Sequence, residues 1–286
     1  MQSNPLFSVL IANYNNGIYL GEALQSVFAQ TYTNWEIIIV DDGSTDNSKE
    51  IYKNYSNDSR IHIYYNEKNN GCGYTKHRCA DLANGKICGF LDPDDALEKT
   101  ALELTVKEHL RFTNASLIYT KHYVCDKNLK IQNEGCSHAI PKNLSYLEYG
   151  HGAISHFATF KKNLYNKTEG INNNFKKAID QDLYLKLEEV GQIVFIPSIL
   201  YYYRTNTGIN ISLGKDNKAV TLWHIIALID TCKRRQLSIE DIIMPYYETF
   251  INFFNQKELN DVYSSFSFKL GKFITKPFHW IIKKIK

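Results

Sequence analysis

Short apolar runs alternate with segments of helical period through the first part of the chain. The apolar runs are FSVLIAN (7–13), WEIIIV (35–40), IHIYY (61–65) and ICGFLD (87–92). Runs of this kind are typical of strands that are covered on both faces. Apolar residues recur at helical spacing in the segments that follow them, at 17–30, 46–55, 74–85 and 96–112. Strands that alternate with helices predict an α/β fold built on a parallel sheet.

The pattern is less regular after residue 112. It predicts a strand at 116–124, a helix near 180–190 and a last strand at 193–203, with a polar, irregular stretch at 125–155. Residues 216–262 have mainly helical patterning, with a polar break near 234–238. We therefore expect two domains, a sheet-bearing domain at 1–212 and a helical C-terminal region at 213–286.

The composition argues against several classes of protein. The 286 residues are 44% hydrophobic and 22% charged, and the net charge of +3 gives no broad basic field for nucleic acid. The six cysteines form no C-x-x-C pair, so we expect reduced thiols. We see no signal peptide and no apolar stretch of about 18 residues, and therefore expect a cytoplasmic protein.

A doubled aspartate ends the second predicted strand, in the sequence VDDGSTD. A phosphatase nucleophile would stand two residues before Asp42, where the chain has Val40. A calcium loop starting at Asp42 would need glycine and glutamate where Asn47 and Lys53 stand. What remains is a pair of hydrogen-bond acceptors at the carboxyl end of a parallel strand, where open α/β sheets bind ligands. Asp46 is expected to cap the following helix.

Two further acidic clusters follow. GFLDPDDAL places Asp92, Asp94 and Asp95 just after a strand, and their mutual repulsion favours a bound Mg²⁺ or Mn²⁺. The alternative is a solvated cluster that caps the helix at 96–112. In AIDQDLYLKL, one of Asp180 and Asp182 is expected to be an N-cap and the other a general base.

The glycines of NNGCGYTKH give only a weak nucleotide signal. Lys76 stands where a dinucleotide fingerprint has its third glycine, and the chain has no P-loop motif. Gly71 and Gly73 are better explained by a tight strand-to-helix turn. Gly85 is expected at the C′ position that closes the next helix.

The three acidic clusters, in this order and spacing, resemble inverting nucleotide-sugar glycosyltransferases of family 2. The resemblance covers residues 5 to about 205 and includes SVLIANYNNGIYL, IIIVDDGSTDNS, GFLDPDD and DQDLYLKL. It implies a GT-A fold, that is, a Rossmann-like, mostly parallel sheet flanked by helices. In that family the residues matching Tyr14 and Asp42 hold the nucleotide base, Asn13 and Asn15 fit the same loop, and Asp41 supports them.

The resemblance also implies which residues bind the metal ion and the phosphates and which one acts as the base. Asp94 would bridge through Mn²⁺ or Mg²⁺ to the donor diphosphate, and Asp92 would contact the ribose or the metal. Asp180 would be the general base. Where many relatives carry ARN, this chain has Lys76 and His77 followed by Arg78, so either Lys76 or Arg78 would meet the phosphates. Arg204 lies in a segment that resembles the family's closing segment and is expected to meet phosphate as well.

These expectations combine into a metal-dependent inverting glycosyltransferase. The donor would be a nucleotide sugar, with UDP as nucleotide, and the acceptor a hydroxyl of a glycan or lipid-linked glycan in surface polysaccharide synthesis. A sugar nucleotidyltransferase and a non-catalytic nucleotide-sugar-binding protein are the alternatives. His138, His151 and His156 could each touch an acceptor or be ordinary loop residues.

The C-terminal segment 266–286 carries six lysines and no acidic residue, with apolar residues at helical spacing. It is expected either to lie on an anionic membrane surface, at the inner membrane face, or to dock on the domain as a basic helix.

Overall fold

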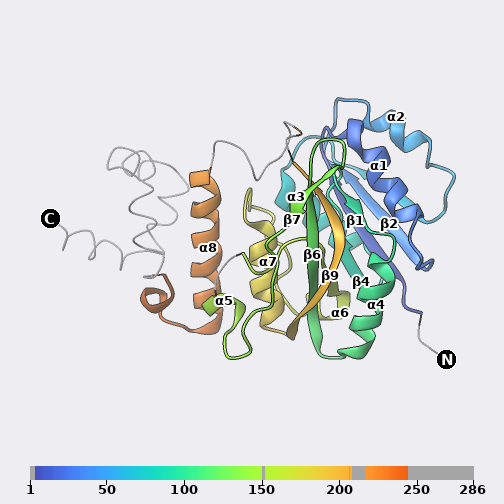
Figure 1. Cartoon of the computed structure of the whole chain (residues 1–286). Coiled ribbons are helices and arrows are strands. Elements are labelled where there is room, and N and C mark those ends of the chain that lie inside the picture. Colours follow the sequence, from blue (N-terminus) through green and yellow to red (C-terminus); the bar gives the residue numbers. More distant parts are fainter. Residues whose placement is uncertain (1–3, 150–151, 206, 208–216, 244–286) are drawn as a thin grey trace. The chain divides into compact units, whose positions relative to one another are not determined.

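The computed structural model of the protein describes residues 4–149, 152–205, 207 and 217–243 (Figure 1). Its strands form one sheet in the order β3-β2-β1-β4-β8-β6-β9-β5, with β7 paired to β6. The strands are β1 (Phe7–Asn13), β2 (Trp35–Asp41), β3 (Ile61–Tyr65), β4 (Ile87–Phe90), β5 (Ala96–Leu97), β6 (Ala115–Cys125), β7 (Ile131–Glu134), β8 (Ala158–Lys161) and β9 (Gln192–Arg204). The helices are α1 (Gly17–Phe28), α2 (Ser48–Lys53), α3 (Cys72–Leu82), α4 (Ala101–Arg111), α5 (Tyr146–Tyr149), α6 (Lys162–Tyr165), α7 (Ile179–Glu188) and α8 (Asn217–Arg235).

The first four strands make a parallel sheet, as the pattern of apolar runs predicts. β1 pairs in parallel with β2 and β4, and β2 pairs in parallel with β3. Every residue of β2 is buried, which is why its sequence shows no alternation of polar and apolar residues. The register aligns Asn13, Asp41 and Tyr65 across the three neighbouring strands. The carboxyl ends of these strands therefore form one edge, and the acidic residues of VDDGSTD lie there.

The other half of the sheet is mixed. β8 lies between β4 and β6 and runs antiparallel to both, whereas β6 and β9 are parallel. Neither β8 nor β7 was expected, because each has only four residues and lies in or next to the polar, irregular stretch. The predicted α/β architecture is confirmed, with an antiparallel strand added in its middle.

Helices bury the sheet through an apolar cluster. Phe7, Val9 and Ile11 of β1 pack with residues of α1 and α4, such as Leu24 and Leu102. Each such side chain contributes about 1.5–3 kcal/mol when it is removed from water. α3 also packs against β1 and β2. The sheet edge that carries the acidic residues is thus held on rigid elements.

Two predicted helix boundaries are wrong. The segment expected as a helix at 96–112 begins with β5, whose Ala96 pairs with Tyr202, and α4 starts only at Ala101. α3 ends at Leu82, so Gly85 is not its C′ residue. A Cβ at Gly85 would lie 2.5 Å from Ser8 Oγ and 2.6 Å from Ser8 N, so glycine there permits close approach to β1.

The C-terminal part divides after α8. Residues 1–235 form one compact unit and 236–286 a second. The expected domain boundary at 212 stays a prediction. The polar break near 234–238 is confirmed: α8 ends at Arg235, Gln236 has a left-handed φ of 55°, and helix resumes at 239–243. In the described residues we find no helix long and apolar enough to cross a membrane. The expected membrane-binding segment 266–286 lies outside them.

Candidate functional site

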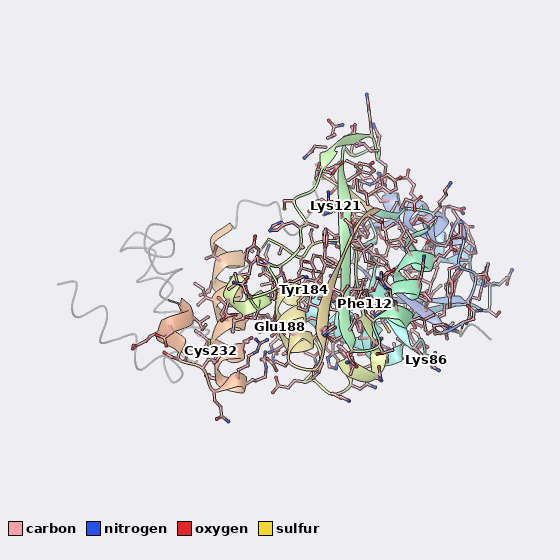
Figure 2. The ribbon with its side chains drawn as sticks, turned by 60° about the horizontal axis from the view of Figure 1, so that its bottom comes forward. Lys86, Phe112, Lys121, Tyr184, Glu188 and Cys232 are labelled. Carbon is pink, nitrogen blue, oxygen red and sulfur yellow. The ribbon has the colours of Figure 1, made fainter. Side chains whose placement is uncertain are left out.

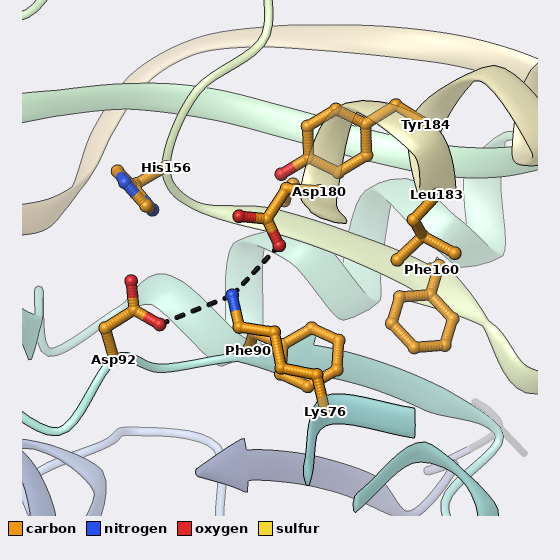
Figure 3. Close-up of a pocket in the computed structure, with 9 residues that line it drawn as sticks. Lys76, Phe90, Asp92, His156, Phe160, Asp180, Leu183 and Tyr184 are labelled. Carbon is orange, nitrogen blue, oxygen red and sulfur yellow. Dashed lines mark hydrogen bonds and ion pairs between the residues drawn. The ribbon is translucent and has the colours of Figure 1, made fainter. Parts of the chain in front are cut away.

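One pocket brings together residues from four parts of the fold. Its lining comes from α3, from the end of β4, from β8 with the residues before it, and from α7 (Figure 3). The lining residues are Lys76, Phe90, Asp92, His156, Ala158, Phe160, Asp180, Leu183 and Tyr184. Two of the three acidic clusters found in the sequence, at 92–95 and 180–182, therefore meet in this pocket.

Lys76 lies between the two clusters. Its ammonium is 2.9 Å from Asp180 Oδ1 and 3.5 Å from Asp92 Oδ1, and its nitrogen is 5.0 Å from the centre of the Phe90 ring. The side chain is only 7% exposed. Burial alone would lower the pKa of Lys76, but the charges of Asp180 and Asp92 outweigh it and hold that pKa well above its ordinary value. Of the two cations proposed to meet phosphate, Lys76 is the one that lines the pocket.

Asp92 stays ionised in spite of its partial burial. Burial acts to raise its pKa, but the positive charge of Lys76, followed by that of His156, lowers the pKa below its usual value. The turn that carries it is tied to β9, because the Tyr201 hydroxyl accepts from Asp92 N at 3.1 Å and donates to Asp95 Oδ2 at 2.8 Å. Asp95 is thus a buried support for the turn.

Asp94 lies in the same turn as Asp92 and is the second carboxylate expected to bind a metal ion. Burial and then the negative charge of Asp92 raise the pKa of Asp94 to about 6. Mg²⁺ and Mn²⁺ are commonly held by one or two carboxylates together with substrate phosphates, and Asp92 with Asp94 fits that donor set. Among the described residues, no group of three or more His, Cys, Asp or Glu side chains is arranged to hold a metal. The fit therefore depends on oxygen atoms supplied by a ligand.

Arg204 lies beneath this turn and does not line the pocket. It is 1% exposed, and its Nε donates to Asp94 O at 2.5 Å. Its guanidinium also donates to Lys127 O at 2.6 Å and to Glu22 Oε2 at 2.5 Å, and its backbone N–H to Asp95 Oδ1 at 2.7 Å. The expected contact with phosphate stays a prediction, whereas support of the acidic turn is observed.

Asp180 is the second residue of α7, which lines one side of the pocket. It lies in the first turn of α7, its side chain is 39% exposed, and it faces Lys76. The neighbouring Asp182 is buried and pairs with Lys186 Nζ at 2.7 Å. Neither aspartate caps the helix: the N-cap is Ala178, in a left-handed conformation, and it makes no side-chain cap. The expectation of one capping aspartate was wrong, because Lys186 one turn on gives Asp182 a stronger partner.

α7 is held in place by α8, which packs beside it. Near the start of α7, Gln181 Oε1 lies 2.6 Å from a ring nitrogen of His224. Near its end, the Arg235 guanidinium donates to Leu185 O at 2.7 Å and to Glu188 Oε2 at 2.9 Å. Figure 2 shows Tyr184 and Glu188 on α7 and Cys232 on the adjacent α8. These contacts fix the direction in which Asp180 enters the pocket.

Asn13 and Asp41 form a buried network at the end of the sheet. Asp41 Oδ2 accepts from the Tyr52 hydroxyl at 2.7 Å and from Asn13 Nδ2 at 3.3 Å, and Asp41 Oδ1 accepts from Ser44 N at 2.8 Å. Both residues are fully buried. They hold the loops that follow β1 and β2 in place, which agrees with the supporting role expected for Asp41. For Asn13 the geometry also indicates support.

Asp42 is bound by the glycine turn. Its Oδ1 accepts from Asn70 N at 2.9 Å, its Oδ2 from Gly71 N at 2.9 Å, and Asn66 Nδ2 donates at 2.7 Å. Gly71 has a φ of +93°, which confirms that this glycine serves a tight turn into α3. Asp42 thus joins β2 to the start of α3, and its contact with a nucleotide base stays a prediction.

The remaining predicted residues lie around the same edge. Tyr14 is 42% exposed, so its ring is accessible to a ligand. Asn15 has a left-handed φ of 54°, and its Oδ1 accepts from Thr45 N at 2.8 Å. Arg78 donates to Tyr65 O at 2.9 Å and also to Asn66 Oδ1, so it lies on the β3 side, away from the pocket lining. Asp46 lies one residue before Asn47, which is the N-cap of α2, so the expected N-cap role was wrong; its carboxylate accepts instead from Ser48 N at 3.0 Å and from Gly17 N at the start of α1 at 2.7 Å.

Sequence reasoning gave little weight to two pocket residues. His156 is stacked between the rings of Tyr201 and Tyr203, with centroids 4.9 and 5.0 Å away, and burial lowers its pKa in spite of the charges of Asp92 and Asp180. Its position follows from β8, which the sequence did not reveal. Tyr184 could have been found, because it stands four residues after Asp180 and so on the same helix face.

Comparison with known proteins identifies close matches. The profile described as "Glycosyl transferase family 2" matches residues 8–168. A chondroitin synthase of Escherichia coli is 34% identical over 214 residues, which are 74% of this chain and 30% of that protein. A hyaluronan synthase of Pasteurella multocida is 32% identical over 218 residues, 74% of this chain and 21% of that protein. The chain thus spans less than a third of the length of these relatives.

Solved structures share the fold. S. aureus TarS in complex with UDP-GlcNAc has a TM-score of 0.64 at 18% identity, covering 94% of this chain and 76% of that chain. The mannosyltransferase PcManGT from Pyrobaculum calidifontis, in complex with GDP-Man and Mn²⁺, has a TM-score of 0.57 at 13% identity, covering 82% and 65%. At these identities the likeness supports the GT-A fold and no more.

Proposed function

This chain belongs to glycosyl transferase family 2, and we propose that it transfers a sugar, with inversion, from a nucleotide-linked donor to a hydroxyl of a glycan or lipid-linked glycan. The observation that carries the proposal is the pocket in which Asp180 and Asp92 flank Lys76 at 2.9 and 3.5 Å. A single displacement needs a base for the acceptor hydroxyl and positive charge near the leaving diphosphate, and Asp180 and Lys76 are proposed to supply them.

Asp180 acts as the general base in this proposal. The acceptor oxygen attacks the anomeric carbon of the donor as its proton passes to the Asp180 carboxylate. The bond between the anomeric carbon and the phosphate oxygen breaks, and the nucleoside diphosphate leaves with the electron pair. A positioned base contributes about 10²–10⁴-fold to such a rate. Attack from the face opposite the leaving group inverts the anomeric carbon.

Asp92 and Asp94 would hold a divalent ion, Mn²⁺ or Mg²⁺, which when bound supplies positive charge to the leaving diphosphate. The sequence supports this assignment, because the two carboxylates stand two residues apart in one turn and an ion would relieve their repulsion. Mn²⁺ is also named with PcManGT, a structural neighbour. Lys76 would add a second positive charge next to the phosphates.

The nucleotide would lie along the carboxyl ends of β1 and β2. Tyr14 offers an exposed ring for the base, and Asp42 is the residue proposed to accept a hydrogen bond from it, with Asn13, Asn15 and Asp41 holding the loop. UDP is the proposed nucleotide, which is in keeping with the UDP-GlcNAc complex of TarS. Arg78 is left as a weaker candidate for phosphate binding.

The acceptor is proposed to be a growing surface polysaccharide. Relatives named as chondroitin and hyaluronan synthases support a role in polysaccharide synthesis. A cytoplasmic location, and contact of 266–286 with an anionic inner membrane face, remain part of the proposal.

Replacement of the base tests the mechanism. Asp180→Asn should lower kcat by about 10²–10⁴-fold while leaving affinity for UDP with Mn²⁺ within about twofold, because the amide keeps the shape of the side chain. Asp81→Asn, which changes a carboxylate on α3 that is 58% exposed, is the matched control and should behave as wild type.

The measurements are rates of nucleoside diphosphate release with a glycan acceptor, and calorimetric titration of nucleotide. Full transfer by Asp180→Asn would rule out this role. Release of pyrophosphate in place of a nucleoside diphosphate would instead identify a sugar nucleotidyltransferase.

A further inference from the structure

His156 presents an unpaired imidazole to the pocket. Its ring is stacked between Tyr201 and Tyr203, with interplanar angles of 14° and 15°, so two side chains of β9 fix its orientation. Within the described part of the chain, its ring nitrogens make no hydrogen bond and no ion pair, although the residue lines the pocket. A polar ring that is held in place without a partner of its own can bind a ligand.

His138, the second histidine considered from the sequence, has both ring nitrogens engaged. One lies 2.6 Å from the carbonyl oxygen of Cys136, and the other lies 2.9 Å from the hydroxyl of Tyr149. His151, the third, lies outside the described residues. Of the two histidines that the structure describes, only His156 borders the pocket of the proposed base.

The proposed base has one oxygen directed toward the His156 side of the pocket. Asp180 pairs with Lys76 through Oδ1 at 2.9 Å, and its Oδ2 makes no hydrogen bond to a described residue. In Figure 3 this second oxygen points toward the side on which His156 lies. The charges of Asp92 and Asp180 act on the His156 ring, yet neither carboxylate forms an ion pair with it. A space therefore separates the ring from both carboxylates.

The free volume limits what can lie in this space. The pocket has room for about one water molecule, and Lys76 already fills the place between Asp92 and Asp180. One water molecule or one hydroxyl group of a sugar fits there, whereas a sugar ring does not. In the proposed reaction, the oxygen that lies against Asp180 Oδ2 is the one whose proton the base removes. The space next to His156 is therefore the place of the attacking oxygen.

The hydrogen bonds of a hydroxyl define the part that His156 can take. A hydroxyl has one proton to donate and two lone pairs. In the displacement, the proton passes to Asp180 and one lone pair attacks the anomeric carbon, so the second lone pair can accept from a ring N–H. Burial lowers the pKa of His156 in spite of the charges of Asp92 and Asp180, so the ring is neutral at pH 7 and carries one N–H. A charged ring would instead be drawn to the carboxylates.

We propose that His156 binds the attacking hydroxyl of the acceptor by donating an N–H hydrogen bond to its oxygen, which turns the remaining lone pair toward the anomeric carbon. The proposal rests on the proposed function and names a second residue for the acceptor side of the same site. His156 moves no proton: the acceptor proton passes to Asp180, and the nucleoside diphosphate leaves with the electron pair. Stacking on Tyr201 and Tyr203 fixes the direction of the hydrogen bond.

Water as the attacking molecule tests the proposal without a known acceptor. The full chain with Mn²⁺ is supplied with hexoses linked to UDP, dTDP or GDP, and release of the nucleoside diphosphate is followed with water alone. The same rates are measured with hyaluronan and chondroitin oligosaccharides, since relatives are named as synthases of these polymers. Initial rates give kcat and the KM of the donor, and calorimetric titration gives the affinity for the nucleoside diphosphate.

Two substitutions separate hydrogen bonding from stacking. His156→Phe keeps a ring between Tyr201 and Tyr203 but has no N–H, and should lower kcat about tenfold while donor KM and nucleotide affinity stay within about twofold. His156→Gln has an N–H but no ring, and should retain more activity than His156→Phe. His62→Phe is the matched control, because its side chain on β3 is 40% exposed and does not line the pocket, and it should behave as wild type.

The outcomes separate this proposal from the transferase proposal. If His156→Phe keeps the wild-type kcat, or weakens donor KM and nucleotide affinity instead, the role of His156 is overturned and the transferase proposal stands. If His156→Gln loses more activity than His156→Phe, the stacked ring and not the N–H is responsible, and the proposal also fails. If the wild-type protein releases a nucleoside diphosphate from none of these donors with any of these acceptors, the transferase proposal itself fails, and this one with it.

Discussion

Lys76 sets the charge balance of the pocket. It is the cation between Asp92 and Asp180, and its charge keeps the pKa of Asp92 low against the effect of burial. Without that charge, the carboxylates of Asp92 and Asp180 would lie in a partly buried site without the cation that now pairs with both of them. The residue therefore affects both the donor side and the base side of the proposed reaction.

Lys76→Met should lower kcat/KM by about 10–100-fold, since a hydrogen bond to a charged group is worth about 1.5–3 kcal/mol. Lys76→Arg keeps the charge and should lose less. Lys86→Met, which changes an exposed lysine just before β4, is the control for loss of charge. Initial rates at saturating donor measure the effect on kcat, and those at limiting donor measure the effect on kcat/KM. Wild-type kinetics of Lys76→Met would contradict the proposed role of Lys76 in the reaction.

Arg204 shows how far residue-level prediction from sequence reached. Its segment resembles the family's closing segment, which suggested a phosphate contact, but its side chain donates to backbone carbonyls of the acidic turn and of Lys127. Arg204→Gln should lower the free energy of unfolding by about 3 kcal/mol even without nucleotide, because several buried groups lose partners.

Arg111→Gln, at a side chain that is 69% exposed, should stay within about 0.5 kcal/mol of wild type in the same denaturant titration. If Arg204→Gln kept its unliganded stability and lost only donor affinity, the phosphate role would be favoured instead.

At the scale of elements, the ends of the parallel strands could be predicted from the sequence, whereas the short strands β5 and β8 could not. The apolar runs located β1 to β4 to within two residues, and so located Asp41, Asp42 and Asp92 at one edge. β5 and β8 could not be found, because a two- or four-residue strand has too few positions to show a period. Three of the nine lining residues, His156, Ala158 and Phe160, depend on β8, so a third of the pocket was hidden from sequence reasoning.

Gly85 tests the packing of the elements at the opposite end of the parallel strands. Gly85→Ala should lower the free energy of unfolding by about 2 kcal/mol or more, because its Cβ would lie 2.5–2.9 Å from atoms of Ser8 and Leu6. Gly21→Ala, in the interior of α1 with no atom within 4 Å of the added Cβ, should raise it by about 0.5–1 kcal/mol. Chemical denaturation measures both, and equal effects of the two substitutions would contradict the argument.

At the scale of the folded unit, buried histidines predict sensitivity to acid. His109 of α4 lies 3.0 Å from Thr159 Oγ1 of β8, and burial, with the charge of Lys161, lowers its pKa to about 3. The unfolded chain binds this proton near pH 6.5 and the folded one only near 3. Stability from this group is therefore full above about pH 6.5 and falls by about 1.4 kcal/mol per unit as the pH drops toward 3.

Denaturant titrations between pH 7.5 and 4.5 should show this loss. His109→Gln should have a shallower dependence on pH, whereas His138→Gln, at an exposed loop histidine, should follow the wild type. An unchanged slope in His109→Gln would show that other groups govern the acid response.

The antiparallel direction of β8 has a consequence for how such enzymes could diversify. A parallel strand at this place would send its exit toward the pocket, and any change there would also shift the helix that follows. Because β8 runs the other way, its entrance meets the pocket, and its exit continues into α6 on the far side. A change in the segment that leads into β8 would therefore alter one wall of the pocket while the parallel half of the sheet keeps its sequence and its pairing.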